Sequence, residues 1–373
     1  MKPSRNFGLD VIRMCAILPV LAEHFFAIAL KNPPAWLWPA GSFGVGIFFV
    51  LSGFLIGGII LRDFAPGMSR GDVRFFYIRR WMRTLPLYFV FFVATMFFTI
   101  AGVKLDAEFN LKCLSYLVFL QNLAWPLPAN WYQETWSLAV EEWFYLLFPI
   151  LFLALPFRGT RARVFGVAAI LTVVPLIVRS VVFWKTGNTV TALQAIVILK
   201  LDSIAIGIFS VLAYEQFSKT VSRNAGLLCA TGTLGAALCY VVPLQLLGNH
   251  PRFMVSFWPI VMAICIAAVM LGARSFEWRR LSNSVVGSIV RWISTRSYAL
   301  YLCNGSIIKL MLAKGFMWRG LDVSLPMFIA ISIVVAELAH RLIEKPFMKM
   351  RPHEKTQSRQ ANGSLTDKSV GAL

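Results

Sequence analysis

The chain has 373 residues, of which 58% are hydrophobic and only 14% are charged. Soluble domains carry about 25% charged residues, so this composition excludes an ordinary soluble protein and predicts an integral membrane protein. The formal net charge of +19 would suit nucleic-acid binding, but the basic residues gather in alternate loops, and we expect no nucleic-acid partner. The six cysteines form no CxxC pair, so we predict neither a disulfide framework nor a metal site.

Ten apolar runs follow one another along the chain with short polar breaks. Each is long enough to cross a bilayer, which takes about 20 residues in a helix. The predicted spans cover residues 8–30, 42–61, 80–101, 134–156, 163–184, 194–215, 224–246, 254–273, 294–313 and 323–343. We therefore predict an all-α membrane protein, a polytopic bundle of about ten transmembrane helices.

The charges between the spans predict how the bundle is oriented. Most of the lysines and arginines lie in loops on one side, which the positive-inside rule makes the cytoplasmic side. Both termini are then cytoplasmic. The stretch 111–124 is short, and we expect a re-entrant or interfacial segment, because an eleventh span would destroy the charge bias. We assign residues 1–347 to one membrane domain and expect residues 348–373 to form a polar, disordered cytoplasmic tail.

The first predicted span places ionisable side chains on one stripe of a helix. Eleven residues separate Arg13 from His24, which amounts to about three turns plus about 20° and a rise of about 16 Å. Asp10 falls on the same stripe. Ionisable groups inside a span are costly and usually mark a functional path. We interpret the stripe as the site of a long substrate that is held by charge at one end and reacts at His24.

In the glycine-rich second span, Gly53 and Gly57 form a GxxxG pattern, which predicts close helix packing. Ser52 lies beside them but has neither a GxSxG motif nor a nearby base in the sequence. We therefore do not expect Ser52 to be a nucleophile. His24 is the remaining candidate for covalent chemistry.

Three arginines mark the cytoplasmic start of the third predicted span. Arg79 and Arg83 are four residues apart, and Arg80 and Arg83 are three apart, so they are neighbours on a helix surface. Guanidinium groups bind phosphates through bidentate hydrogen bonds. With Arg13 beside them, they form a candidate phosphate site. The alternative is a topology signal that contacts lipid headgroups.

The fourth predicted span contributes the carboxylate of Glu141, about seven residues below its outer end. His24 lies about six residues below the outer end of its own span, so we expect the two groups at similar depth. A carboxylate beside an imidazole fixes its tautomer and makes it a better general base. Alternatively, the pair only ties two helices together. Glu142 points about 100° away from Glu141 around the helix. The spacing alone does not decide which of the two glutamates lies beside His24.

A series of short motifs runs through the chain in order. It comprises Arg-x10-His (Arg13, His24), FFVLSGFLI (48–56), RRxxR before a proline-tyrosine pair (79–88), WSLAVEEWFYLLFP (136–149), LDSIAIG (201–207), SYALYL (297–302) and IEKP (343–346). Together these motifs resemble the integral-membrane acyltransferase-3 family, which O-acylates cell-surface carbohydrates and some small molecules. The resemblance extends from about residue 7 to 347, and it implies a ten-helix bundle and an acyl-coenzyme A donor.

The resemblance also implies roles for individual residues. It makes His24 the catalytic histidine and Glu141 the motif carboxylate. The implied donor contacts are Arg13, Arg79, Arg80 and Arg83. Two positions depart from the family pattern: Asn304 stands where a histidine is frequent, and Ile47 where an acidic residue is frequent. Asparagine cannot titrate, so we assign no proton transfer to Asn304.

The expected function is transfer of a short acyl group, with acetyl as the first choice, from cytoplasmic acyl-CoA to a hydroxyl of a surface polysaccharide or lipid-linked sugar. The donor, acetyl-CoA on this reading, is a co-substrate, and no permanently bound cofactor is expected. The expected location is the bacterial cytoplasmic (inner) membrane, in contact with its lipids. The alternative is a transporter or flippase of a lipid-linked sugar, which would use the same buried charges without acyl chemistry.

Overall fold

The computed structural model describes residues 5–63, 69–100, 111–125, 127, 131–186, 195–246 and 256–352. Throughout these residues the regular secondary structure is helical, which confirms the predicted all-α class. The long helices are α1 (Phe7–Ala29), α2 (Trp38–Asp63), α3 (Arg70–Ile100), α4 (Trp136–Ala154), α5 (Thr160–Thr186), α7 (Asp202–Arg223), α8 (Ala225–Leu246), α10 (Trp258–Ser275), α12 (Val285–Ala313) and α13 (Leu321–Ala339). The short ones are α11 (Arg279–Ser282), α14 (Lys345–Met350), η1 (Ala35–Leu37), η2 (Leu111–Val118), η3 (Gln133–Thr135), η4 (Val197–Leu199), η5 (Phe316–Trp318) and the π-helical η6 (His340–Glu344).

Each predicted span overlaps one of the long helices, although α7 begins eight residues after the start of the predicted span 194–215. Within the described part of the chain, seven helices are long and apolar enough to cross a membrane, or eight if α7 and α8 count as one span bent by 104°. The polar helix α12 is not among the seven. The chain is thus a multi-pass membrane protein, whereas the count of about ten spans and the cytoplasmic location of both termini stay predictions.

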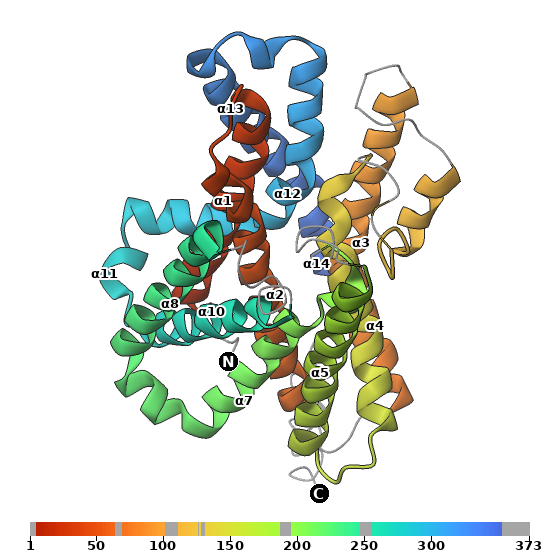
Figure 1. Cartoon of the computed structure of the whole chain (residues 1–373), viewed down its shortest axis with the longest axis vertical. Helices are drawn as coiled ribbons and strands as arrows, with labels where there is room; N and C mark the ends of the chain where they lie inside the picture. The colour runs from red at the N-terminus through yellow and green to blue at the C-terminus, as the bar shows by residue number, and fades with distance from the viewer. Residues whose placement is uncertain are drawn as a thin grey trace, which may run out of the picture.

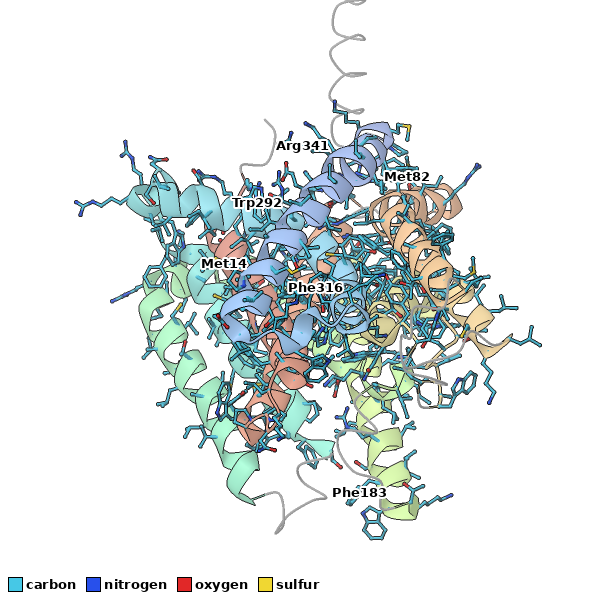
Figure 2. The ribbon with its side chains drawn as sticks, turned by 90° about the horizontal axis from the view of Figure 1, so that it is seen from above. Met14, Met82, Phe183, Trp292, Phe316 and Arg341 are labelled. Carbon is cyan, nitrogen blue, oxygen red and sulfur yellow. The ribbon has the colours of Figure 1, made fainter. Side chains whose placement is uncertain are left out.

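The helices surround α1 and α2, which lie in the middle of the bundle. Figure 1 shows α3, α4 and α5 on one side of them and α7, α8 and α10 on the other. Large apolar side chains stay exposed on the outer helix faces, including Ile100 (69% exposed) and Trp184 (72%), and many side chains project from the rim of the bundle (Figure 2). Such a surface suits contact with lipid tails rather than with water.

Glycine contacts bring neighbouring helices close together. A Cβ added at Gly53 of α2 would lie 1.9 Å from the carbonyl oxygen of Ile204, and one added at Gly207 of α7 would lie 2.1 Å from that of Val50. Only hydrogen fits between two backbones at this distance. The close packing predicted from Gly53 is therefore confirmed, and α7 is its partner helix.

The contacts of α1 show the direction of its neighbours. Gly44 of α2 packs against Ala16 and Val20, whereas Gly41, nearer the start of α2, packs against Glu23. These two helices are therefore antiparallel, as expected of two successive spans.

Helix α12 runs in the same direction as α1. Near its start, Ser294 donates a hydrogen bond of 2.6 Å to Asp10. Ten residues further on, Asn304 contacts His24 at 2.5 Å. Equal directions are expected for the first and ninth predicted spans, so this contact pattern agrees with the alternation that the ten-span prediction requires.

The described residues between α3 and α4 include buried side chains. The stretch predicted to be re-entrant or interfacial contains η2, a 3₁₀ helix over residues 111–118. At about 2 Å per residue it is about 16 Å long, too short to cross a bilayer. Trp131 and Tyr132, shortly before α4, are fully buried. Helix α4 consequently begins inside the protein rather than at its outer surface.

The predicted orientation can be tested with fusion reporters. A reporter near residue 160, between α4 and α5, should report a cytoplasmic location, and one within residues 102–133 should report an extracytoplasmic location. The expectation follows from the excess of basic residues around residues 158–163 and other inner loops. Alkaline phosphatase and fluorescent-protein fusions measure it. An extracytoplasmic signal near residue 160 would contradict both the orientation and the span count.

Candidate functional site

Five arginines line one cavity beside the N-terminal half of α3. The cavity takes its guanidinium groups from α1, from α3 and from the segment after α14, namely Arg13, Arg79, Arg80, Arg83 and Arg351. Its lining also contains one acidic residue, Asp63, which is ion-paired with Arg62 at 2.7 Å. We call this space the arginine cavity. Such an excess of guanidinium groups attracts a ligand with several negative charges.

Arg13 is held in place by the first turn of α1. The carboxylate of Asp10 lies 3.5 Å from the Arg13 guanidinium. Asp10 is fully buried, accepts hydrogen bonds from both Arg5 and Ser294, and is therefore fixed in position. The predicted gathering of Arg13 with the three arginines of α3 is present in the structure.

Arg351 is a member of this group that the sequence analysis missed. It falls within residues 348–373, which were assigned to a tail. In the structure α14 continues to Met350, Arg351 lines the arginine cavity, and the carbonyl of Pro352 accepts a hydrogen bond from Arg79. The continuing basic pattern after the IEKP motif is the only signal that could have indicated it. The remainder of the assigned tail, residues 353–373, lies outside the described residues.

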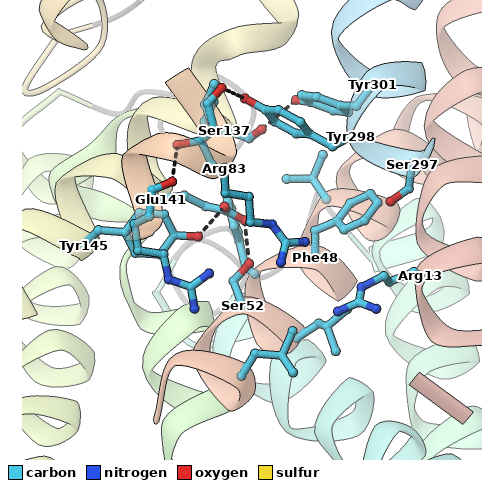
Figure 3. A pocket seen from close by; sticks show the side chains of 17 residues that line it. Arg13, Phe48, Ser52, Arg83, Ser137, Glu141, Tyr145, Ser297, Tyr298 and Tyr301 are labelled. Atoms are coloured by element: carbon cyan, nitrogen blue, oxygen red, sulfur yellow. Dashed lines mark hydrogen bonds between the residues drawn. The ribbon is translucent and has the colours of Figure 1, made fainter. Parts of the chain in front are cut away.

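A second cavity adjoins the first. Both cavities share Arg13, Arg80 and Arg83 in their linings. Apolar side chains of α2 form one part of its lining, polar side chains of α1, α3, α4 and α12 form the other, and the labelled residues converge on the cavity in Figure 3. We call it the channel cavity. A space that combines apolar walls with convergent polar groups suits a ligand that has both apolar and polar parts.

Glu141 lies in the channel cavity. Its carboxylate accepts hydrogen bonds from the Ser52 hydroxyl at 2.7 Å and from the Tyr145 hydroxyl at 2.8 Å (Figure 3). Glu142 is also buried, but it accepts a hydrogen bond from Thr84 at 2.7 Å and is not part of the cavity lining given by the described residues. The structure thus distinguishes the two neighbours that spacing could not. It also gives Ser52 the nearby carboxylate that the sequence analysis did not expect.

His24 lies away from Glu141. Its Nδ1 is 2.5 Å from Oδ1 of Asn304, and its Nε2 is 3.3 Å from the carboxylate of Glu23. Among the described residues, neither ring nitrogen is hydrogen-bonded to Glu141. The predicted His24–Glu141 pair is therefore wrong. Glu23 was missed because adjacent residues on a helix do not normally face each other, although a carboxylate directly before an intramembrane histidine was a visible signal.

The prediction of equal depth failed because α4 starts deep in the protein. Gly41 of α2 contacts Glu23, the neighbour of the histidine. Ser52, which binds Glu141, lies eleven residues further along α2, about 16 Å deeper. Residues 131–135 fold inward, so counting from the start of α4 does not measure depth from the outer surface. Glu141 therefore lies near the level of the arginines.

Asn304 fixes the orientation of the imidazole. Its amide nitrogen donates to the carbonyls of Leu300 and Tyr301, at 3.2 and 2.6 Å. Its amide oxygen is therefore the atom that faces His24, and it can only accept. The proton of the neutral imidazole is then on Nδ1, and Nε2 presents a lone pair. The asparagine that departs from the family pattern thus contacts the imidazole through its amide oxygen.

The channel cavity leads toward His24. Tyr301 of α12 lies in its lining, and Asn304 follows three residues later, about 4.5 Å further along the helix. On α2, Val45 lines the cavity, and Gly41 lies about 6 Å beyond it. His24 is therefore about one helical turn beyond the outer end of the channel cavity, while the arginines lie at the other end.

The other position that departs from the family pattern is also explained. Ile47 is buried in the apolar core that α2 forms with its neighbours. Its side chain has no polar atom, so a coordinating role is absent there. Within the described ranges, no group of three His, Cys, Asp or Glu side chains comes together in a way that could hold a metal ion.

Comparison with known proteins supplies the family context. The acyltransferase-3 family model, described as an acyltransferase domain, matches residues 6–338. The chain is 27% identical to the peptidoglycan O-acetyltransferase OatA of Listeria monocytogenes, over 92% of this chain and 56% of the relative. It is 25% identical to the O-acetyltransferase OatA of Staphylococcus aureus, over 92% of this chain and 57% of the relative. The chain thus spans about half the length of these relatives. No solved structure matches it.

Proposed function

The chain belongs to the acyltransferase-3 family, and from this premise we propose that it transfers a short acyl group from acyl-CoA to a hydroxyl of a cell-surface glycan. Family membership confirms the predicted resemblance and the predicted enzyme class, an acyltransferase, and favours acyl chemistry over the transporter alternative. The observation that carries the proposal is the pair of adjoining cavities, which begins at five arginines and ends about one helical turn from His24.

The charge of the arginine cavity and its position next to the channel cavity support coenzyme A as the donor. Acyl-CoA carries phosphates at one end and a thioester at the end of a long flexible arm. We assign the phosphates to the arginine cavity, where guanidinium groups can form bidentate hydrogen bonds. The arm would follow the channel cavity, where Ser52, Ser137 and Tyr298 could bind its amide groups. The thioester would then lie at the outer end, below His24.

In the proposed reaction His24 is the general base. Nε2 removes the proton of the acceptor hydroxyl while the hydroxyl oxygen attacks the thioester carbonyl. The carbon–sulfur bond breaks, and the coenzyme A thiolate leaves and takes up the proton from the imidazolium. Glu23, 3.3 Å from Nε2, stabilises the imidazolium while it exists. The acceptor enters from the outer side, so donor and acceptor approach from opposite faces of the membrane.

The names of the relatives support a proposal for the acceptor and the acyl group. The Listeria protein is named a peptidoglycan O-acetyltransferase, and we propose acetyl as the acyl group and a cell-surface glycan as the acceptor, in the cytoplasmic membrane of a bacterium. The test uses purified protein in nanodiscs, radiolabelled acetyl-CoA and cell-wall glycan from which existing esters have been removed by mild base. Base-labile label should appear in the glycan. Label that never leaves coenzyme A would refute the proposal.

The arginine cavity gives a prediction for donor binding. Arg83→Ala and Arg351→Ala should each raise KM for acyl-CoA about tenfold or more, with a smaller change in kcat, because each loses a charge-assisted hydrogen bond that is made equally in the ground and transition states. Arg13→Lys should lose part of the affinity, because an ammonium lacks the bidentate fork. Steady-state kinetics and calorimetric titration of coenzyme A measure these effects.

Lys349→Ala is the matched control. Lys349 is an exposed cation on the same segment as Arg351, so its loss should leave KM unchanged. If the arginines only direct membrane insertion, the variants will be poorly inserted and their inserted fraction will bind coenzyme A with normal affinity. That result would refute the proposal that the arginine cavity binds coenzyme A.

A further inference from the structure

Near the outer end of the channel cavity lies a carboxylate, Glu134, to which the reaction above gives no role. Glu134 belongs to η3, directly before α4, and is only 5% exposed. Its Oε1 is buried and has no hydrogen-bond partner among the described residues. Buried polar atoms nearly always have a partner, because an unsatisfied one costs free energy. An unsatisfied carboxylate oxygen at this place therefore points to a ligand.

The neighbouring carboxylates are already engaged. Glu141 accepts hydrogen bonds from Ser52 and Tyr145, and Glu23 lies beside Nε2 of the histidine. Among the described residues near this end of the channel, Glu134 is therefore the carboxylate that retains a buried acceptor oxygen for a further hydrogen bond.

Contacts with α12 locate this carboxylate. A Cβ added at Gly305 would lie 2.0 Å from Oε1 of Glu134, so the carboxylate occupies the space that a side chain at position 305 would fill. The backbone carbonyl of Glu134 accepts a hydrogen bond from the hydroxyl of Tyr301, which lines the channel cavity. Glu134 is thus fixed at the turn of α12 that follows the outer end of the cavity.

The helix geometry puts Glu134 and His24 on one face of α12. Asn304 comes three residues after Tyr301 and points about 60° to one side of the Tyr301 side chain around the helix axis. Gly305 comes four residues after Tyr301 and lies about 40° to the other side. Asn304 holds His24, and Gly305 accommodates Glu134. The histidine and the carboxylate therefore flank the same helix face, one turn beyond the cavity.

We propose that Glu134 binds the acceptor, and that its ligand is a sugar with neighbouring hydroxyl groups. This inference rests on the proposed function. While one hydroxyl loses its proton to Nε2 of His24, Oε1 of Glu134 accepts a hydrogen bond from a neighbouring hydroxyl. A carboxylate is the acceptor that forms the strongest such bond. Glu134 thereby selects which oxygen of the sugar faces the thioester, and it makes no contact with the donor phosphates.

The test compares Glu134→Gln with the wild type, using acetyl-CoA and base-treated cell-wall glycan as probes. Transfer should fall about tenfold through a higher KM for the glycan, because the amide is a weaker acceptor than the carboxylate. Coenzyme A affinity and protein yield should be unchanged. Gln133→Ala, at the exposed neighbouring position, is the control and should transfer normally.

A second variant, on helix α12, perturbs the same carboxylate. Gly305→Ala should reproduce the defect, because the new methyl group would displace Oε1. Gly58→Ala, where a Cβ would make an ordinary contact at 3.6 Å, is the control for a helix glycine. The double variant of Glu134 and Gly305 should be no worse than the poorer single variant, since both remove one interaction.

The outcomes separate this inference from the proposed function. If the wild type transfers acetyl groups and Glu134→Gln transfers them equally well, acceptor binding by Glu134 is refuted and the proposed function stands. Equal losses of coenzyme A affinity and transfer in Glu134→Gln would show a structural role and also refute it. A wild type that binds coenzyme A but never acylates the glycan would refute the proposed function, and this inference with it.

Discussion

Replacing His24 with alanine should lower acyl transfer by at least about two orders of magnitude and leave coenzyme A binding intact. General acid–base groups typically contribute about 10²–10⁴ in rate, and His24 is the proposed general base. The arginines lie at the opposite end of the channel, and Arg13 is about 16 Å from His24 along α1. The loss should therefore appear in kcat and hardly in donor affinity. Ester content of isolated glycan and calorimetric titration of coenzyme A measure the two quantities.

His340→Ala is the matched control for this experiment. His340 lies in η6 with its Nδ1 2.8 Å from Glu344, and we expect its loss to leave transfer within a few-fold of the wild type. The decisive comparison is between well-inserted His24→Ala and the wild type at equal protein levels. If the His24 variant produced a glycan with normal ester content, the role of His24 as the general base would be refuted.

Asn304→Ala should have a smaller effect than His24→Ala. Without the amide oxygen, the imidazole proton is free to move to Nε2, which would leave no lone pair for the acceptor. We therefore attribute to Asn304 a positioning role that acts through His24. The residue is a departure from the family pattern, yet its hydrogen bonds give it a function that sequence comparison alone did not suggest.

The fold was predictable because its dominant signal is local. Runs of about twenty apolar residues form helices in a bilayer whatever their neighbours are, and each predicted run overlaps a long helix. The arginine cavity was predictable for the same reason. Arg79, Arg80 and Arg83 are close in sequence on one helix, and Arg13 lies near the same end of a span.

What failed was the relation between segments that are distant in sequence. The depth of Glu141 was counted from the start of its apolar run, and this assumed that the run begins at the membrane surface. The inward fold of residues 131–135 breaks that assumption, since no local pattern reports that Trp131 and Tyr132 are buried. Arg351 was missed because a charged, polar segment looks the same whether it is solvated or packed against a cavity.

Glu141→Gln should reduce transfer about a hundredfold, whereas Glu142→Gln should stay within a few-fold of the wild type. Glu141 lies in the channel cavity and accepts hydrogen bonds from two side chains, Ser52 and Tyr145. The substitution preserves the size of the side chain but removes its charge and one acceptor oxygen, so one of the two partners loses its hydrogen bond and the other keeps only a weaker, neutral acceptor. Glu142 binds Thr84 outside that path. Transfer kinetics of both variants at matched expression measure the contrast.

The pH dependence of transfer identifies how Glu141 acts. A carboxylate paired with His24 would stabilise the imidazolium and so raise the affinity of the imidazole for a proton. Loss of such a partner would lower that affinity and shift the rise in activity to lower pH. In the structure Ser52 lies about 16 Å deeper than the level of His24, and Glu141 is bound to Ser52. We therefore expect Glu141→Gln to lower the rate without moving the profile. Ser52→Ala should give a milder loss, since one of the two hydrogen bonds remains. If the pH profile of Glu141→Gln were displaced to lower pH, the result would support direct pairing of Glu141 with His24 and contradict this expectation.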